Sequence, residues 1–280
     1  MNVLQIVTQI EALRDSRAAL PEPVGFIPTM GYLHDGHISL VKRAKEQSAS
    51  VVVSIFVNPT QFAPTDDLDA YPSNLERDAA LLQEAGADLL WTPTPAIMYP
   101  SDFQTWVNVE TLTQPLEGEK RPGHFRGVTT IVAKLFNAVQ PQKAFFGQKD
   151  AQQVAVIRQM VRDLNIPVEI VTLPIIRERD GLAMSSRNTY LNPAERQAAL
   201  VLSKSLAAAK SAYEQGIFNL ASLRALMEAI INAEPLARLE YVSCADYDTL
   251  AELELLTGKT LLSMAVYIGS TRLIDNQVLG

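Results

Sequence analysis

Short apolar runs alternate with amphipathic segments between residues 24 and 173. We expect strands at residues 24–28, 50–57, 87–92, 143–146 and 168–173, and helices at 37–47, 75–84, 128–139 and 151–164. Residues 51–57 are uncharged and mostly β-branched, which is typical of a parallel strand covered on both faces. Strands that alternate with helices predict a parallel sheet with crossover helices, and such a sheet binds ligands at the carboxyl ends of its strands.

The pattern changes after Pro174. Residues 177–181 combine charges with a glycine and predict a turn. Asn192 and Pro193 predict the start of a long helix that reaches Glu214. A second helix over 220–230 and strands at 239–245 and 261–268 are expected to follow. We therefore predict two domains, an α/β domain at 1–175 and a smaller C-terminal α+β domain at 176–280.

Composition narrows the class of protein. Apolar residues make up 48% and charged residues 20% of the 280 positions, which excludes a disordered or coiled-coil chain. The 24 basic and 31 acidic residues give a net charge of -7, so we expect no nucleic-acid partner. The apolar run at 51–57 ends at the polar residues 58–61, which would be unsatisfied in a bilayer, so we expect no membrane span or membrane partner. The single cysteine, Cys244, and the lack of a signal-peptide pattern favour a cytoplasmic location.

The densest polar cluster directly follows the first of these strands. It comprises Met30, Gly31, Tyr32, Leu33, His34, Asp35, Gly36 and His37. The unpaired backbone N–H groups at a helix start attract phosphate, and glycine lets a ligand approach the backbone closely. Because a histidine ring can donate a hydrogen bond to a phosphate oxygen, we interpret the cluster as a phosphate site with His34 and His37 as donors.

Two other roles fit the same histidines. His34 and His37 could bind zinc with His124, the one remaining histidine of the chain, or they could be structural. The glycine-rich setting favours an anion over a metal ion.

A second cluster, residues 56–62, follows the second expected strand. Asn58 and Gln61 offer uncharged donors and acceptors, which suit a substrate with hydroxyl and carboxylate groups. The same residues could also form an ordinary turn.

Two further clusters offer charge to a nucleotide. In residues 145–153, Lys149 supplies a cation, Asp150 is a ligand type that magnesium prefers, and Gln153 lies one helical turn later. In residues 184–188, serines and Arg187 could close over a triphosphate. Taken alone, a Lys-Asp pair is commonly solvated and a hydroxyl-rich loop is commonly a surface turn.

Together the clusters resemble a known family. Residues 30–37 look like the His-x-Gly-His signature of the class I aminoacyl-tRNA synthetase and nucleotidylyltransferase superfamily, and residues 184–188 are similar to its mobile Lys-Met-Ser-Lys-Ser loop. Within that superfamily the chain resembles the pantothenate synthetase (pantoate–β-alanine ligase) family. The matching segments are, in order, 56–62, 121–128, 147–153, 180–188 and 272–276. The resemblance implies a Rossmann-like parallel sheet of the nucleotidylyltransferase type.

The resemblance also implies roles for individual residues. His34, His37, Lys149 and Arg187 would be catalytic, because they would stabilise the reacting phosphates. The implied ATP site comprises Met30, Gly31, Tyr32, Leu33, His34, Asp35, Gly36, His37, Gly147, Gln148, Lys149, Asp150, Ile176, Met184, Ser185, Ser186 and Arg187.

For this family the resemblance implies a two-step reaction. The carboxylate of (R)-pantoate attacks the α-phosphorus of ATP and releases diphosphate, and the amine of β-alanine then displaces AMP from pantoyl adenylate. Pantoate would bind Gln61 and Gln153, β-alanine would also contact Gln61, and Mg²⁺ would accompany ATP at Asp150. No protein nucleophile is needed, and Cys244 lies outside all four clusters. The resemblance further implies a homodimer, and Arg121 with residues 123–125 would border the same cleft.

One residue departs from the family pattern, and one segment suggests movement. Ala151 stands where the family has an aromatic residue, and we expect only the local packing to differ because Asp150 and Gln152 match. Residues 63–72 are polar and contain prolines, and we interpret them as a gate over the pantoate pocket.

Three other functions fit parts of the pattern. They are an enzyme of the same superfamily that activates a different acid, a nucleotide-binding regulatory protein without turnover, and a zinc hydrolase. Diphosphate release from ATP that depends on pantoate would separate the first two from the expected ligase, and metal analysis would test the third.

Overall fold

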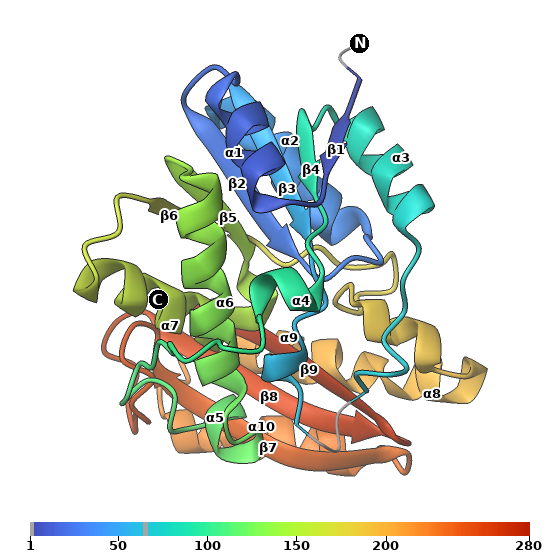
Figure 1. Ribbon diagram of the computed structural model, residues 1–280. Helices are drawn as coiled ribbons and strands as arrows, with labels where there is room; N and C mark the ends of the chain where they lie inside the picture. Colours follow the sequence, from blue (N-terminus) through green and yellow to red (C-terminus); the bar gives the residue numbers. More distant parts are fainter. Residues whose placement is uncertain (1–2, 64–66) are drawn as a thin grey trace. The chain divides into compact units, whose positions relative to one another are not determined.

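The computed structural model describes residues 3–63 and 67–280 (Figure 1). The chain forms two compact units. Unit 1 is Met1–Gly147 with Val156–Pro174, and unit 2 is Gln148–Ala155 with Ile175–Gly280. The division into domains at 1–175 and 176–280 stays a prediction.

Unit 1 is built on a parallel sheet, as the alternation of strands and helices predicts. Its strands are β1 (Gln5–Val7), β2 (Val24–Thr29), β3 (Ser50–Ile55), β4 (Leu89–Trp91), β5 (Lys143–Gly147) and β6 (Glu169–Leu173). They lie in the order β1-β4-β3-β2-β5-β6, and every pairing is parallel. The chain runs outward from β2 to β4 and then, on the other side, from β5 to β6. The carboxyl ends of β2 and β5 therefore flank the point where strand order reverses, which is where open α/β sheets bind ligands.

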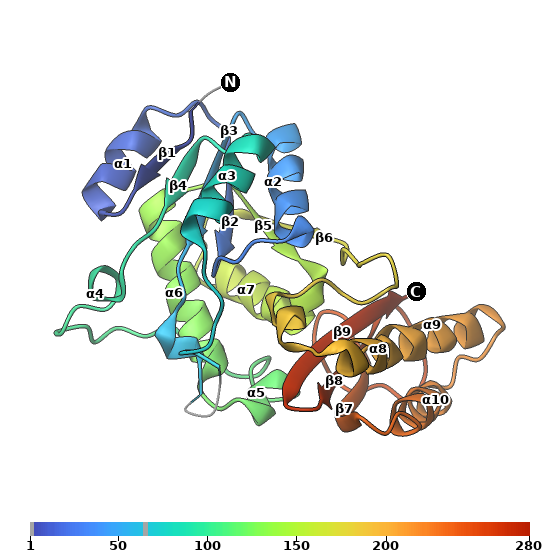
Figure 2. The same cartoon turned by 90° about the vertical axis from the view of Figure 1, so that its right-hand side faces the viewer.

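Helices cover both faces of this sheet (Figures 1 and 2). They are α1 (Ile10–Ala18), α2 (Asp35–Gln47), α3 (Leu75–Ala85), α6 (His124–Val139) and α7 (Ala151–Asp163). Two single-turn helices, α4 (Pro95–Met98) and α5 (Glu117–Lys120), lie in the connection between β4 and α6. On one face Val41 of α2 and Leu82 of α3 share a buried core with Val53 of β3. On the other face Phe136 of α6 meets Phe26 of β2 edge to face, with 6.3 Å between the ring centroids.

Unit 2 carries a three-stranded antiparallel sheet in the order β7-β8-β9. The strands are β7 (Ala237–Asp246), β8 (Thr260–Ile268) and β9 (Thr271–Leu279), and the helices are α8 (Pro193–Ala198), α9 (Leu200–Glu214) and α10 (Leu220–Asn232). Leu206 of α9 and Met227 of α10 are buried in one core with Met264 of β8. The side chains of Asn192 and Glu195 form a capping box at the start of α8, which confirms the predicted helix start.

Several elements differ from the sequence prediction. The long helix expected to reach Glu214 is divided at Ala199 into α8 and α9. Ala199 has φ -59° and ψ -22°, and neither glycine nor proline marks the division in the sequence. The helix α6 begins at His124 and not at residue 128, because Gly123 turns the chain immediately before it with φ 84°. The strand β9 was not expected. None of the helices in the described part of the chain combines the length and hydropathy that a bilayer crossing requires.

Candidate active site

A tight turn leads from β2 into α2. Gly31 and Tyr32 both have positive φ, 85° and 49°. A Cβ atom at Gly31 would lie 3.0 Å from Ile55 Cγ2 and 3.3 Å from Asp78 Oδ2, so the turn needs glycine for space as well as for conformation. The Asp78 carboxylate, in α3, accepts hydrogen bonds from the backbone N–H groups of Tyr32 and Leu33 at 2.7 and 2.8 Å. The path of the chain into the two histidines therefore depends on Asp78.

Asp78 is not among the site residues that the sequence predicts. The side chain is 1% exposed, and it lies four residues before the buried Leu82 on the same face of α3. The signal in the sequence is an aspartate on the face of α3 that otherwise carries apolar residues. A carboxylate buried there needs hydrogen-bond donors, which would have marked Asp78 as a structural residue of the site.

His34 and His37 cap the N-terminus of α2. The Gly36 N–H donates to Nδ1 of His34 at 3.1 Å, and the His34 N–H donates to Nδ1 of His37 at 3.3 Å. A ring nitrogen that accepts a hydrogen bond carries no proton, so each neutral ring carries its proton on Nε2. The ring centroids are 4.1 Å apart. Two Nε2–H donors thus lie side by side at a helix N-terminus, which itself favours anions.

Gln61 ends a 3₁₀ turn that follows β3, and Asn58 orients its side chain. Asn58 Nδ2 donates to Gln61 Oε1 at 3.0 Å and to the Gly127 carbonyl at 3.2 Å, and its Oδ1 accepts from the hydroxyls of Thr60 and Tyr99 at 3.0 and 2.9 Å. Burial raises the pKa of Tyr99, which keeps its hydroxyl protonated as a donor. Because Asn58 is 1% exposed and makes these four contacts, it supports Gln61, whereas the sequence suggested that it faces a substrate.

The backbone of Gln61 is held from α6 and the preceding loop. Its carbonyl accepts from His124 Nδ1 at 2.7 Å and from Arg121 Nη2 at 3.4 Å, and its Nε2 lies 3.2 Å from Met30 Sδ. Since a carbonyl only accepts, His124 carries its proton on Nδ1, and its Nε2 accepts from Arg121 Nη1 at 3.3 Å. His124 is thus the opposite tautomer from the two histidines of α2. Within residues 3–63 and 67–280, no three His, Cys, Asp or Glu side chains are grouped as metal ligands.

Gln148, Lys149 and Asp150 form a 3₁₀ turn before α7 and belong to unit 2. Lys149 Nζ lies 3.8 Å from Asp150 Oδ1, and 49% of the Asp150 side chain is exposed. A single accessible carboxylate fits Mg²⁺, which ordinarily takes its other ligands from phosphate and water. Gln153 is half-buried on the first turn of α7. It lies two residues after Ala151, the position at which the chain differs from the family pattern.

Residues 176–188 bring together the other predicted ATP residues of unit 2. The Met184 N–H donates to the Ile176 carbonyl at 3.0 Å, and Ser185 Oγ accepts from the Arg187 N–H at 3.3 Å. Ser186 is buried at the start of a 3₁₀ turn. The side chain of Ser185 thus caps the turn that carries Arg187.

The structure places the predicted site residues in two groups. In unit 1, residues 30–37 and Gln61 follow β2 and β3, and Gly147 ends β5. In unit 2 lie Gln148, Lys149, Asp150, Gln153, Ile176, Met184, Ser185, Ser186 and Arg187. Their roles as ligands stay predictions. Of the predicted gate, residues 64–66 lie outside the described residues, and turn hydrogen bonds join Ala70 to Asp67 and Tyr71 to Leu68.

Comparisons with known proteins identify the family and the fold. The family model described as Pantoate-beta-alanine ligase matches residues 4–278. A pantothenate synthetase of Roseiflexus sp. (strain RS-1) is 56% identical over 276 residues, 99% of each chain. The crystal structure of pantothenate synthetase from Thermus thermophilus has a TM-score of 0.94 at 49% identity and covers 98% of each chain. That of pantoate-beta-alanine ligase from Francisella tularensis, complexed with Beta-gamma ATP and Beta-alanine, has a TM-score of 0.81 at 34% identity, covering 98% of this chain and 97% of that one.

Proposed function

The chain belongs to the pantoate–β-alanine ligase family, and we propose that it joins (R)-pantoate to β-alanine with ATP as co-substrate. The products are (R)-pantothenate, AMP and diphosphate, so the chain is a ligase of pantothenate biosynthesis, which supplies the precursor of coenzyme A. The observation in the site that best supports this activity is the pair of Nε2–H donors of His34 and His37 at the start of α2.

In the first step, a carboxylate oxygen of pantoate attacks the α-phosphorus of ATP, the bond from that phosphorus to the bridging oxygen breaks, and diphosphate leaves. Negative charge grows on the oxygens around the α-phosphorus as the new bond forms. His34 and His37 would donate hydrogen bonds to these oxygens, and Lys149 and Arg187 would offset the charge of the triphosphate. These four residues are the proposed catalytic residues.

In the second step, the amine of β-alanine attacks the acyl carbon of pantoyl adenylate. The C–O bond to the phosphate breaks, AMP leaves with the bonding electrons, and the nitrogen loses a proton as the amide forms. Gln61 and Gln153 would bind pantoate, and Gln61 would also contact β-alanine. The contacts of Asn58 and His124 would fix Gln61 in place, so that binding loses less conformational entropy.

The remaining proposed ATP contacts come from short segments next to the catalytic residues. They are Met30, Gly31, Tyr32, Leu33, Asp35, Gly36, Gly147, Gln148, Asp150, Ile176, Met184, Ser185 and Ser186. Asp150 would hold Mg²⁺, which when bound neutralises charge on the phosphate oxygens.

We also propose that the chain acts as a homodimer in the cytoplasm. Closed twofold dimers are the commonest oligomers of soluble enzymes. The free thiol of Cys244 suits a reducing compartment. Light scattering at low protein concentration would decide the oligomeric state.

Diphosphate release from ATP tests the proposed function. With pantoate alone, we expect a burst of about one diphosphate per chain, because the adenylate stays bound, and with β-alanine added we expect steady turnover. Burst and turnover with a different carboxylic acid and not with pantoate would contradict the proposal, as would ATP binding without release. Stoichiometric zinc in the purified protein, with loss of activity on chelation, would favour the hydrolase hypothesis instead.

A further inference from the structure

The strand β9 buries two consecutive polar side chains. Asp275 is 2% and Asn276 is 3% exposed, although consecutive residues of a strand point to opposite faces. Asp275 pairs with Met264, which belongs to the core beneath α9 and α10, and Asn276 pairs with Ser263. The two side chains therefore serve opposite faces of the sheet.

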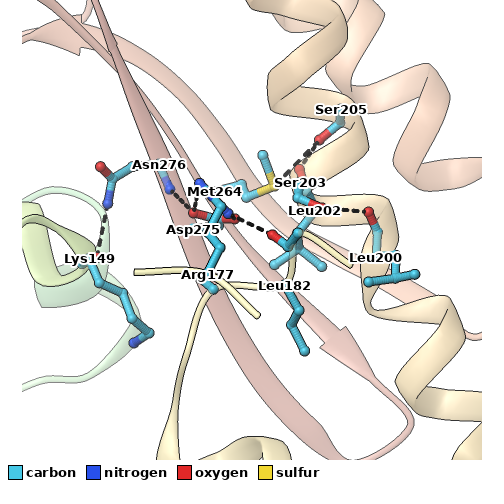
Figure 3. A network of polar contacts seen from close by, with 12 residues as sticks. Lys149, Arg177, Leu182, Leu200, Leu202, Ser203, Ser205, Met264, Asp275 and Asn276 are labelled. Carbon is cyan, nitrogen blue, oxygen red and sulfur yellow. Dashed lines mark hydrogen bonds and ion pairs between the residues drawn. The ribbon is translucent and has the colours of Figure 1, made fainter. Parts of the chain in front are cut away.

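Asn276 binds the backbone of the turn that carries Lys149. Its Nδ2 donates to the carbonyls of Gln148 and Lys149 at 3.0 and 2.9 Å, and its Oδ1 accepts from Gln148 Nε2 at 3.2 Å. Figure 3 shows the Asn276 side chain directed at the backbone of Lys149, whose own side chain extends away from it. Asn276 thus fixes two consecutive carbonyls, and with them the direction in which the Lys149 side chain leaves the turn.

Asp275 binds the segment between Ile176 and Met184. Its two carboxylate oxygens accept from Arg177 Nη1 and Nη2 at 2.6 and 2.9 Å (Figure 3), and Arg177 Nη1 also donates to the Gly181 carbonyl at 3.1 Å. A bidentate pair of this kind fixes direction as well as distance. Arg177 directly follows Ile176, so the pair holds the turn at its first residue.

We propose that Asp275 and Asn276 are positioning residues for the nucleotide, Asn276 through Lys149 and Asp275 through Arg177. This proposal rests on the proposed function, because it takes the Lys149 turn and residues 176–184 to contact ATP. Neither side chain touches the substrate in this scheme. Asn276 would hold the turn of Lys149, the proposed phosphate-binding cation. The residue before it, Asp275, would hold the segment that begins at Ile176.

Two nearly isosteric variants remove these contacts. Asn276→Asp replaces both N–H donors with an acceptor that faces two carbonyl oxygens, and Asp275→Asn removes the charge opposite Arg177. Ser263→Ala is the matched control, because Ser263 pairs with Asn276 across the strands and its buried hydroxyl has no hydrogen-bond partner among the described residues. Where Asn276→Asp does not fold, Asn276→Ala removes the same donors without adding charge.

Pantoate-dependent diphosphate release at varied ATP concentration gives kcat/KM for ATP. We expect Asn276→Asp and Asp275→Asn to lower it about 10- to 100-fold, the scale for displacing a reacting group by a fraction of an ångström to one ångström, and Ser263→Ala to stay within about 2-fold of wild type. Values within about 2-fold of wild type for both strand variants would overturn the proposal.

A double-mutant cycle separates positioning from general loss of structure. If Asn276 acts through Lys149, the factor lost on Asn276→Asp must be more than about 2-fold smaller in a Lys149→Ala background than in wild type, whereas a structural defect costs the same factor in both. Equal factors would overturn the proposal.

Failure of the proposed function can be distinguished from failure of the positioning proposal. If the proposed function fails, wild type itself releases no diphosphate with pantoate. Calorimetric titration with ATP alone then tests the positioning residues: weaker ATP binding by both strand variants supports their role, and unchanged affinity overturns it.

Discussion

Nδ1 of His37 accepts a hydrogen bond from the backbone N–H of His34, 3.3 Å away. Nδ1 of His34 does the same for Gly36, so the helix start itself selects the tautomer of both rings. Nothing in the spacing of two histidines predicts which nitrogen carries the proton. The capping geometry does, and it leaves Nε2 as the N–H donor of each ring.

Long-range ¹H–¹⁵N correlation spectra of histidine-labelled protein, recorded where the rings are neutral, test the tautomers. We expect Nε2 to be protonated in His34 and His37 and Nδ1 in His124, because His124 Nδ1 faces the Gln61 carbonyl at 2.7 Å. The same tautomer in all three rings would contradict the assignment.

Two amide variants of His37 separate its cap from its donor. His37→Asn places an acceptor near the position of Nδ1 but has no group at Nε2, whereas His37→Gln reaches the position of Nε2 with an N–H donor. We expect His37→Asn to slow adenylate formation by about 2 to 4 kcal/mol of barrier, as for a lost transition-state donor, and His37→Gln to slow it less. Single-turnover diphosphate release measures both, and the reverse order would assign the catalytic role to Nδ1.

Asp78→Asn should loosen the turn before the histidines. Its amide nitrogen cannot accept from Tyr32 or Leu33, so one backbone N–H loses its buried acceptor, at a cost of about 1 to 3 kcal/mol in unfolding free energy. We also expect a raised KM for ATP with a smaller change in the KM for pantoate. Urea unfolding and steady-state kinetics check these effects. Glu76→Gln, an exposed change on the same helix, is the control, and equal effects of both variants would contradict a specific role.

Cys244 predicts how stability changes at alkaline pH. Burial raises the pKa of its thiol from 9.0 to about 11. Between these values the unfolded chain loses the thiol proton and the folded chain keeps it, so the folded state loses stability as pH rises. Relative to Cys244→Ala, wild type should lose about 1 to 3 kcal/mol of unfolding free energy over this range, measured by urea unfolding at each pH. Parallel curves for the two proteins would contradict the shifted pKa.

Local pattern was enough for most of the fold. Buried parallel strands such as β3 leave long β-branched runs, and amphipathic helices such as α9 and α10 repeat apolar residues at helical spacing. The strand β1 was missed because it spans only Gln5–Val7, with two of its three residues exposed. The division at Ala199 was missed because no glycine or proline marks it, and Ala199 itself has right-handed helical φ and ψ.

The parts of the candidate site that could be predicted from the sequence are those formed by consecutive residues. The His-x-Gly-His turn and the Lys149 turn belong to that class. Asp78 and Asn276 do not, because their partners lie 46 residues before and 127 residues before them in the sequence. A hydrogen bond over such a distance leaves no periodicity in either segment, and only the folded backbone brings its two ends together.

The separation between Lys149 and Asn276 also has a consequence for synthesis of the protein. A ribosome adds Asn276 127 residues after Lys149, a delay of about 6 to 25 s at ordinary elongation rates of about 5 to 20 residues per second. Early in that interval β6, the last strand of the parallel sheet, is completed, while the turn of Lys149 still lacks its anchor. A nascent chain therefore contains every strand of the parallel sheet well before Asn276 is present to hold the turn of Lys149.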